Sequence, residues 1–283
     1  MTIRLPFTKA SGAGNDFVLL NAMKGPLPVD YAVLARAVCD RHFGVGGDGL
    51  LVLEPAPRAD FLMRYYNADG SYGGMCGNGG RCAARYAFLE RIAGSHMRFE
   101  ALDYVYEADV AASGIVRLSM KDPSGFRPGI SLFTGKGGAE EGTFIDTGAP
   151  HVVIFSGNID ALDVETLGRA IRSDSAFAPA GTNVNFATPP DGSRVRIRTY
   201  ERGVEAETLA CGTGSVASAL VSAARFGLRS PVSVRVRSGE ELLVHFTGNA
   251  SAWHDITLEG SAHILFQGTL LYDPASSTLR ESP

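Results

Sequence analysis

The residues with the clearest chemical potential are two cysteines that share the short pattern Cys-Gly-x-Gly. Cys76 begins one copy and Cys211 the other, and each copy leads into an Ala-rich segment that predicts a helix, over 78–91 and 212–226. A cysteine at the start of a helix lies beside free backbone N–H groups and the positive end of the helix dipole. Because both stabilise a thiolate, we expect the pKa of each thiol to fall below about 8.5.

Two such thiols could move protons at a carbon atom. The N–H groups at a helix start also bind anions, and the glycines let a ligand approach the backbone, so we expect a carboxylate beside each thiol. Inverting a carbon centre requires a base on one face of the planar intermediate and an acid on the other, and a thiolate and a thiol supply both. With each sulfur roughly 3 to 3.5 Å from the carbon, the sulfurs would lie on the order of 7 Å apart, on two lobes.

The other two cysteines, Cys39 and Cys82, are expected to be small buried hydrophobes, because both fall inside helical patterns. Four cysteines are too few for a disulfide framework, and the absence of C-x-x-C makes a zinc site improbable. The glycine-rich run 44–49 lacks the spacing of a dinucleotide-binding loop, and no lysine stands in a pyridoxal phosphate context. We therefore expect no cofactor and no metal.

Composition favours a two-domain protein that acts on a small molecule. The chain has 283 residues, 45% of them hydrophobic and 20% charged, with a net charge of −4 and no basic stripe. This balance argues against nucleic-acid partners and anionic membrane surfaces. The N-terminal segment lacks a signal core, and no run approaches the roughly 18 apolar residues of a membrane span. We expect a cytoplasmic protein, and a homodimer.

Short β-branched or aromatic runs bounded by Gly, Pro or Asp predict strands over 17–21, 50–54, 61–67, 104–110, 115–120, 143–146, 151–155, 194–200, 232–236 and 242–246. Helices are also expected from a cap at Asp30 to about Arg41 and over 164–172, and Gly227 is a predicted C-cap. The Gly- and Pro-rich stretch 123–142 predicts a linker or surface excursion.

The repeated cysteine pattern suggests an internal duplication with one copy in each half. The segment Gly14 to Phe17 is a weaker candidate match to Thr182 to Phe186. We expect an N-terminal lobe of 1–121, completed by 262–283, and a C-terminal lobe of 122–261.

Taken together, these residues resemble the diaminopimelate epimerase family, over nearly the whole chain. The landmarks run in order as Gly14-Asn15-Asp16-Phe17, Asp40-Arg41-His42, Gly44 to Gly49, Asn67-Ala68-Asp69-Gly70-Ser71, Met75-Cys76-Gly77-Asn78-Gly79, Gly148-Ala149-Pro150-His151, Gly181-Thr182-Asn183, Tyr200-Glu201-Arg202-Gly203 and Ala210-Cys211-Gly212-Thr213-Gly214. The resemblance implies an α+β fold with two pseudo-symmetric lobes. Each lobe would be a curled, barrel-like mixed or antiparallel sheet around a central helix, with the active site in the cleft between them.

The resemblance also implies a role for each site residue. Cys76 and Cys211 would be the acid/base pair that interconverts LL- and meso-diaminopimelate without a cofactor. The reacting carboxylate would be held by backbone N–H groups, those of Gly77, Asn78, Gly212 and Thr213. The distal groups of the substrate or its reacting amine would be bound by Asn15, Asn67, Asn183 and Arg202, whereas His151 and Glu201 would contact the amine or tune the thiols. By itself, Asn67 in Asn-Ala-Asp-Gly also fits a turn.

Two positions depart from the family pattern, since some members carry Asn where this chain has Ala149 and Gln where it has Gly49. Three other readings stay open. Proline racemases and hydroxyproline epimerases resemble this family but typically have His at the position of Asn78. Phenazine-type isomerases of similar fold lack the cysteine pair. A non-catalytic amino-acid-binding protein, or a redox sensor joining Cys76 to Cys211, would bind a ligand without exchanging its α-proton.

Overall fold

The chain divides into two compact units, and the computed structural model describes residues 2–133 and 139–280. Unit 1 joins Met1–Leu118 to Gly260–Pro283, whereas unit 2 is Ser119–Glu259. From the sequence, the boundaries are expected after residues 121 and 261.

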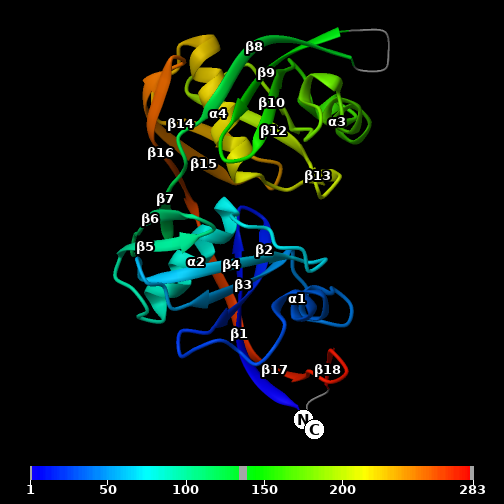
Figure 1. The fold of residues 1–283 in the computed structure, drawn as a ribbon. Coiled ribbons are helices and arrows are strands. Elements are labelled where there is room, and N and C mark those ends of the chain that lie inside the picture. The colour runs from blue at the N-terminus through cyan, green and yellow to red at the C-terminus, as the bar shows by residue number, and fades with distance from the viewer. Residues whose placement is uncertain (1, 134–138, 281–283) are drawn as a thin grey trace. The chain divides into compact units, whose positions relative to one another are not determined.

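Unit 1 is a mixed sheet with helices α1 and α2 packed against it (Figure 1). Its strands pair in the order β17–β1–β2–β3–β4–β5–β6–β7, with β18 beside β17. The pairs β2–β3 and β4–β5 are parallel, and a helix forms each of these two crossovers. The elements are β1 (Ile3–Gly12), β2 (Asn15–Asn21), α1 (Tyr31–Cys39), β3 (Gly49–Glu54), β4 (Phe61–Asn67), α2 (Gly77–Leu89), β5 (His96–Ala101), β6 (Tyr104–Val110), β7 (Ile115–Ser119), β17 (His263–Asp273) and β18 (Thr278–Leu279).

Unit 2 has the same kind of sheet, in the order β8–β9–β10–β11–β12–β14–β15–β16, with β13 beside β12. The pairs β10–β11 and β12–β14 are parallel, with α3 and α4 in their crossovers. The elements are β8 (Ser124–Phe133), β9 (Ala139–Asp146), β10 (Pro150–Phe155), η1 (Ile159–Ala161), α3 (Val164–Arg172), η2 (Ser175–Phe177), β11 (Asn183–Ala187), β12 (Arg194–Glu201), β13 (Ala206–Thr208), α4 (Gly212–Phe226), β14 (Val232–Arg235), β15 (Glu241–Asn249) and β16 (Ala252–Ser261).

The two units repeat one topology. Strands β1 to β4 correspond in order to β9 to β12, and β5 to β7 correspond to β14 to β16, with the same alternation of parallel and antiparallel pairs. Helices α1 and α2 correspond to α3 and α4, and β17 beside β1 corresponds to β8 beside β9. The expected α+β fold with pseudo-symmetric lobes is therefore confirmed.

The register of the strands corrects one detail of the duplication. Phe17 lies opposite Gly49 in the β2–β3 pair, and His151 lies opposite Asn183 in the β10–β11 pair. Gly14-Asn15-Asp16-Phe17 thus corresponds to Gly148-Ala149-Pro150-His151, and both leading glycines have nearly the same positive φ, 99° and 97°. The match of 14–17 to 182–186 was wrong, because it compared an early strand of one unit with a later strand of the other.

The two Ala-rich helices are the central helices of their units. α2 packs against β1, β2, β3, β4, β6 and β17, and α4 packs against β9, β10, β11, β12, β14 and β15. Since strands surround them, both helices are buried on nearly every face, and their many Ala, Gly and Ser side chains let the strands approach closely. Gly227 ends α4 in the left-handed conformation, as predicted.

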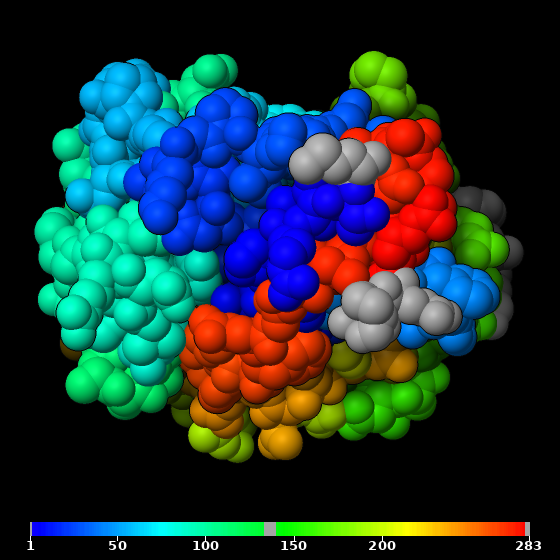
Figure 2. Space-filling view, turned by 90° about the horizontal axis from the view of Figure 1, so that it is seen from below, coloured from blue at the N-terminus to red at the C-terminus, as the bar shows by residue number. Residues whose placement is uncertain are grey.

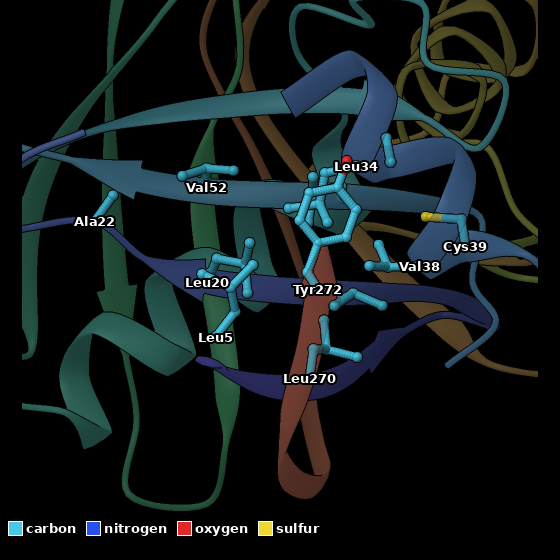
Figure 3. Packing of buried hydrophobic residues seen from close by; sticks show 12 residues of the cluster. Leu5, Leu20, Ala22, Leu34, Val38, Cys39, Val52, Leu270 and Tyr272 are labelled. Atoms are coloured by element: carbon cyan, nitrogen blue, oxygen red, sulfur yellow. The ribbon is translucent and has the colours of Figure 1, made fainter. Parts of the chain in front are cut away.

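The other helix of unit 1, α1, covers a separate apolar cluster. Asp30 caps the helix by accepting hydrogen bonds from the backbone N–H groups of Ala32 and Val33. Figure 3 shows Leu34, Val38 and Cys39 of this helix gathered with side chains of β2, β3 and β17. Cys39 and Cys82 are both buried, which confirms the expectation for these two thiols.

The first strand of the chain and the long strand β17 near its C-terminus pair at one end of the unit 1 sheet. β1 pairs with β17 along most of its length, from Ile3 opposite Tyr272 to Ser11 opposite His263. Figure 2 shows the red surface of the C-terminal strands beside the dark blue surface of the N-terminal strand. The C-terminal segment therefore belongs to the N-terminal lobe.

The stretch 123–142, expected to be a linker or a surface excursion, lies largely at the surface in its described residues but is mostly strand. Its described residues form β8 and β9, which pair as antiparallel strands with two register shifts in β8. Gly125 and Gly129 have φ of 65° and 72° and flank those shifts together with Pro128. The Gly and Pro residues mark bulges rather than a linker, because an irregular strand needs these backbone conformations. Residues 134–138 of the stretch lie outside the described residues.

Candidate active site

Cys76 and Cys211 occupy the same backbone position in the two units. Each is the N-cap of its central helix, with φ and ψ of −124° and 121° for Cys76 and −124° and 116° for Cys211. Their carbonyls accept the first intrahelical hydrogen bonds, from Gly80 at 2.7 Å and Ser215 at 2.9 Å. Both thiols therefore lie beside the N–H groups and positive dipole of a helix start. We call the residues around Cys76 the first half-site and those around Cys211 the second.

In the first half-site, polar side chains line the start of α2. The Cys76 Sγ accepts a hydrogen bond from the Gly79 N–H at 3.5 Å. Arg81, one turn into the helix and fully buried, donates to the Asn78 Oδ1 at 2.9 Å and to the Gly77 carbonyl at 3.3 Å. A buried guanidinium thus adds positive charge at the end of the helix that carries Cys76.

The side chain of Asn78 continues this network into the strands. Its Nδ2 donates to the Asn15 Oδ1 at 2.6 Å, and the Asn15 Nδ2 donates to the Asp48 Oδ2 at 2.9 Å. Arg41 then bridges Asp48 and Asp16, at 2.8 Å to each. The structure thus brings Asn15 and Asn78, two of the predicted binding residues, together with Cys76 and Gly77.

Asn67 lies at the end of β4, where it starts a turn. Its carbonyl accepts from the Gly70 N–H, and its Nδ2 donates to the Ser71 hydroxyl at 2.9 Å, so the turn anticipated from the sequence is present. Its Oδ1 accepts from the Tyr65 hydroxyl at 2.7 Å. A Cβ added at Gly49 would lie 2.5 Å from the Tyr65 ring and 2.5 Å from the Tyr66 carbonyl oxygen. Tyr65 therefore fills the space in which a side chain at position 49 would begin.

The second half-site is a buried chain of hydrogen bonds that starts at the thiol. The Cys211 Sγ lies 3.5 Å from the Thr213 Oγ1, which lies 2.9 Å from the His151 Nε2. The His151 Nδ1 lies 3.1 Å from the Nδ2 of Asn185 on the neighbouring strand. Thr147 fixes the turn from the other side by donating to the Thr213 carbonyl at 2.9 Å.

Asn185 is fully buried and uses both ends of its amide. Its Nδ2 also donates to the Val152 carbonyl at 3.1 Å, and its Oδ1 accepts from the Thr199 hydroxyl at 3.0 Å. A Cβ added at Gly214 would overlap this Oδ1 and would lie 3.3 Å from the Cys211 Sγ. The second glycine of this Cys-Gly-x-Gly is therefore required by packing within the protein.

His151 is neutral near physiological pH. Burial and, to a smaller extent, the positive charge of Arg202 lower its pKa from 6.5 to about 3. The imidazole is fully buried, so its hydrogen-bond partners are the side chains described above.

The remaining predicted residues lie on β11 and at the end of β12. The Asn183 Nδ2 donates to the Pro150 carbonyl at 3.0 Å, and its Oδ1 accepts from the Arg202 backbone N–H at 2.9 Å. The Arg202 guanidinium donates to the Ala180 carbonyl at 3.1 Å, and Glu201 accepts from the Thr208 hydroxyl. Ala149 is half-buried and, by the strand register, stands where Asn15 stands in unit 1.

The structure adds residues that the motifs did not single out. Asn185, Thr147 and Thr199 belong to the second half-site, and Arg81 and Tyr65 to the first. The alternation of Asn183 and Asn185 in a strand of otherwise apolar residues was the available signal for Asn185, because it places both amides on one face.

The described residues contain no group of three His, Cys, Asp or Glu side chains that could hold a metal ion. Within residues 2–133 and 139–280, no helix has both the length and the apolar composition needed to cross a membrane.

The family model for diaminopimelate epimerase matches residues 7–122 and 143–262. The diaminopimelate epimerase of Chlorobaculum tepidum is 48% identical over 266 residues, covering 92% of this chain and 99% of that protein. The diaminopimelate epimerase of Aquifex aeolicus is 41% identical over 278 residues, covering 94% of this chain and 98% of that protein.

Solved structures share the fold at low sequence identity. A phenazine biosynthesis protein of the PhzF family from Bacillus anthracis has a TM-score of 0.74 at 14% identity, covering 94% of this chain and 99% of that chain. A probable proline racemase from Agrobacterium radiobacter has a TM-score of 0.72 at 15% identity, covering 95% of this chain and 94% of that chain. These likenesses concern the fold alone.

Proposed function

The chain belongs to the diaminopimelate epimerase family, and we propose that it interconverts LL- and meso-2,6-diaminopimelate with Cys76 and Cys211 as the two proton carriers. The observation that supports this mechanism is the matched geometry of the two cysteines. Each caps a central helix, with φ and ψ that agree within a few degrees, and each unit contributes one. A reaction that adds a proton on one face of a carbon and removes it from the other requires two such groups.

In the proposed reaction, each of the two sulfurs acts on one face of the reacting carbon. One thiolate removes the α-proton and becomes a thiol, and the electron pair of the C–H bond passes to the carbon and its carboxylate. The opposite thiol then donates its proton to the other face and becomes a thiolate. The C–H bond broken is replaced by one of opposite configuration, and the two sulfurs have exchanged roles.

The helix starts supply the stabilisation that this carbanion needs. We assign the backbone N–H groups of Gly77, Asn78, Gly212 and Thr213 to the reacting carboxylate, because the first N–H groups of a helix have no intrahelical acceptor. Fixed dipoles of this kind act on developing charge without reorganisation.

The polar groups around each thiol are assigned by their positions. Glu201 is assigned to the reacting amine, and Asn15, Asn67, Asn183 and Arg202 to the distal amino and carboxylate groups. His151 is assigned to tuning the Cys211 thiol rather than to direct contact, since it is fully buried and meets that sulfur through Thr213.

The test is proton NMR of the reduced protein with LL-diaminopimelate in D₂O. We expect deuterium exchange at the α-carbon and conversion to the meso isomer. Cys76→Ala and Cys211→Ala should each abolish inversion, whereas Cys39→Ala, which removes a buried thiol outside both half-sites, should keep it. Full inversion by either active-site variant would refute the two-thiol mechanism. Exchange of L-proline or hydroxyproline alone would instead identify the activity of the sister enzymes.

We further propose that the protein works in the cytoplasm as a homodimer. The four cysteines, all within the described residues, are thiols and not disulfides, as a reducing compartment would keep them. Leu265 and Phe266, neighbours in β17, are both about half exposed and lie at the bulge where the register of the β1–β17 pair shifts. This bulge thus presents apolar surface that a second copy could cover. Light scattering coupled to size exclusion should give twice the chain mass, and a monomer at micromolar concentration would contradict the proposal.

A further inference from the structure

We propose that Asn185 is a positioning residue that fixes which nitrogen of His151 carries the proton, and that it thereby turns the Thr213 hydroxyl into a hydrogen-bond donor to the Cys211 sulfur. This inference deepens the proposed function, on which it rests. It assigns a role to a residue that touches no substrate and acts through two others.

The first step is the orientation of the Asn185 amide. The Val152 carbonyl can only accept a hydrogen bond, so the amide atom 3.1 Å from it must be the nitrogen. The Thr199 hydroxyl, 3.0 Å from the other amide atom, is compatible with the oxygen there. The amide nitrogen has two hydrogens, one for Val152 and one directed to the His151 Nδ1 at 3.1 Å.

The second step follows from the chemistry of a neutral imidazole. A ring nitrogen that accepts a hydrogen bond has no proton, so the single N–H of His151 is on Nε2. This N–H points to the Thr213 Oγ1 at 2.9 Å. Because that oxygen accepts from His151, its own hydrogen is directed elsewhere, and the Cys211 Sγ lies 3.5 Å away. The whole chain of donors thus runs from Asn185 toward the sulfur and favours its thiolate form.

The third step is a comparison between the two units, which share a strand register. His151, Asn185 and Thr199 of unit 2 correspond to Phe17, Leu51 and Tyr65 of unit 1. Both Phe17 and Leu51 are fully buried, so the fold accepts an apolar pair at these positions. Burying a polar pair costs more than burying an apolar one, and the polar pair in unit 2 therefore requires a reason other than packing.

The close approach of Asn185 to the thiol supports the same conclusion. Gly214 has no room for a Cβ because of the Asn185 Oδ1, whereas the equivalent Gly79 in unit 1 faces the methyl groups of Leu51. The positive charge of Arg202 acts on His151 and disfavours the imidazolium form, in which both ring nitrogens are protonated. The imidazole is thereby kept in the neutral form on which the tautomer argument depends.

The direct test uses ¹⁵N-histidine-labelled wild-type protein without substrate. The nitrogen signals of His151 are identified as those missing from the spectrum of His151→Gln. We expect Nε2 to be protonated and Nδ1 to be unprotonated at pH 7.5, and a protonated Nδ1 would overturn the proposal. This measurement needs no folded variant at position 185, and it stands even if the protein does not act on diaminopimelate.

The functional test compares Asn185→Leu with Cys39→Ala. Asn185→Leu removes the donor to His151 and introduces the residue found at the equivalent position of unit 1, whereas Cys39→Ala changes a buried side chain outside both half-sites. We expect kcat/KM to fall on the order of tenfold in Asn185→Leu and to change little in Cys39→Ala. An unchanged kcat/KM in Asn185→Leu would overturn the positioning role.

A third readout separates positioning from a merely structural role. In a Cys76→Ala background, alkylation of Cys211 by iodoacetamide, followed by mass spectrometry, gives the pH at which the thiol is half reactive. Asn185→Leu should raise that midpoint by about one pH unit, and Thr213→Val should do the same. In the double variant the two effects should not add, because both act through one hydroxyl. Additive effects would contradict the chain of donors.

Discussion

His151 makes the stability of unit 2 depend on pH in a calculable way. Its pKa in the folded protein is about 3, whereas an unfolded chain would give it the ordinary 6.5. Between these values the unfolded state binds more protons, so the folded state loses stability as the pH falls below about 6.5. At pH 4.5, two units below the unfolded value, the loss is about 2 to 3 kcal/mol, since each unit corresponds to about 1.4 kcal/mol.

The assay is urea unfolding followed by the fluorescence of Trp253, the single tryptophan, which is buried in β16 of unit 2. The side chain introduced by His151→Gln cannot titrate. The difference in free energy of unfolding between wild type and this variant should therefore shrink by about 2 to 3 kcal/mol between pH 7 and pH 4.5. The carboxylates titrate in both proteins and cancel in the difference. His263→Gln, at an exposed position, should follow wild type at both pH values. Parallel pH curves for wild type and His151→Gln would refute the claim that burial holds His151 neutral.

Two further predictions concern the scaffold of unit 1. Gly49→Ala should lower the free energy of unfolding in urea by about 1 to 3 kcal/mol, because the new Cβ would lie 2.5 Å from the Tyr66 carbonyl oxygen. The control is Gly157→Ala, whose Cβ would have no atom within 4 Å. Equal stabilities of the two variants would contradict the packing argument. Asp30→Ala should lower the free energy of unfolding by about 1 kcal/mol, because it removes the acceptor for two backbone N–H groups of α1. Asp30→Asn should retain most of that stability, because its side-chain oxygen can still accept. Equal stabilities of the two variants would rule out the cap.

Local chemistry made several elements predictable from the sequence. The caps at Asp30 and Gly227 were identified because each depends on residues adjacent in the chain. Helix α3 and strand β4 were predicted with the bounds observed, since their apolar periodicity is strong over their whole length. The Cys-Gly-x-Gly pattern was likewise enough to place both thiols at helix starts.

Features that depend on distant pairing were not predictable. Strand β1 contains Pro6 and Lys9, and β17 contains Gln267 and Gly268, so neither has a clear strand pattern. They form because the two ends of the chain pair with each other. Strand β8 was mistaken for part of a linker because its glycines serve bulges whose partner strand cannot be seen locally. Asn185 was not identified from the sequence for the same reason, because its role depends on contacts with residues of β10 and α4.

The register of the two units explains how one fold can hold two thiols in different chemical environments. The central helices and their capping cysteines have matching backbones, so the geometry required for attack from two faces is repeated. The strands beneath them differ, with Phe17 and Leu51 under one helix start and His151 and Asn185 under the other. A buried cation, Arg81, lies near Cys76, whereas a neutral chain of donors leads to Cys211. In the reaction we propose, each sulfur is a thiolate in one direction and a thiol in the other, and two distinct means of stabilising the charge let both states remain accessible.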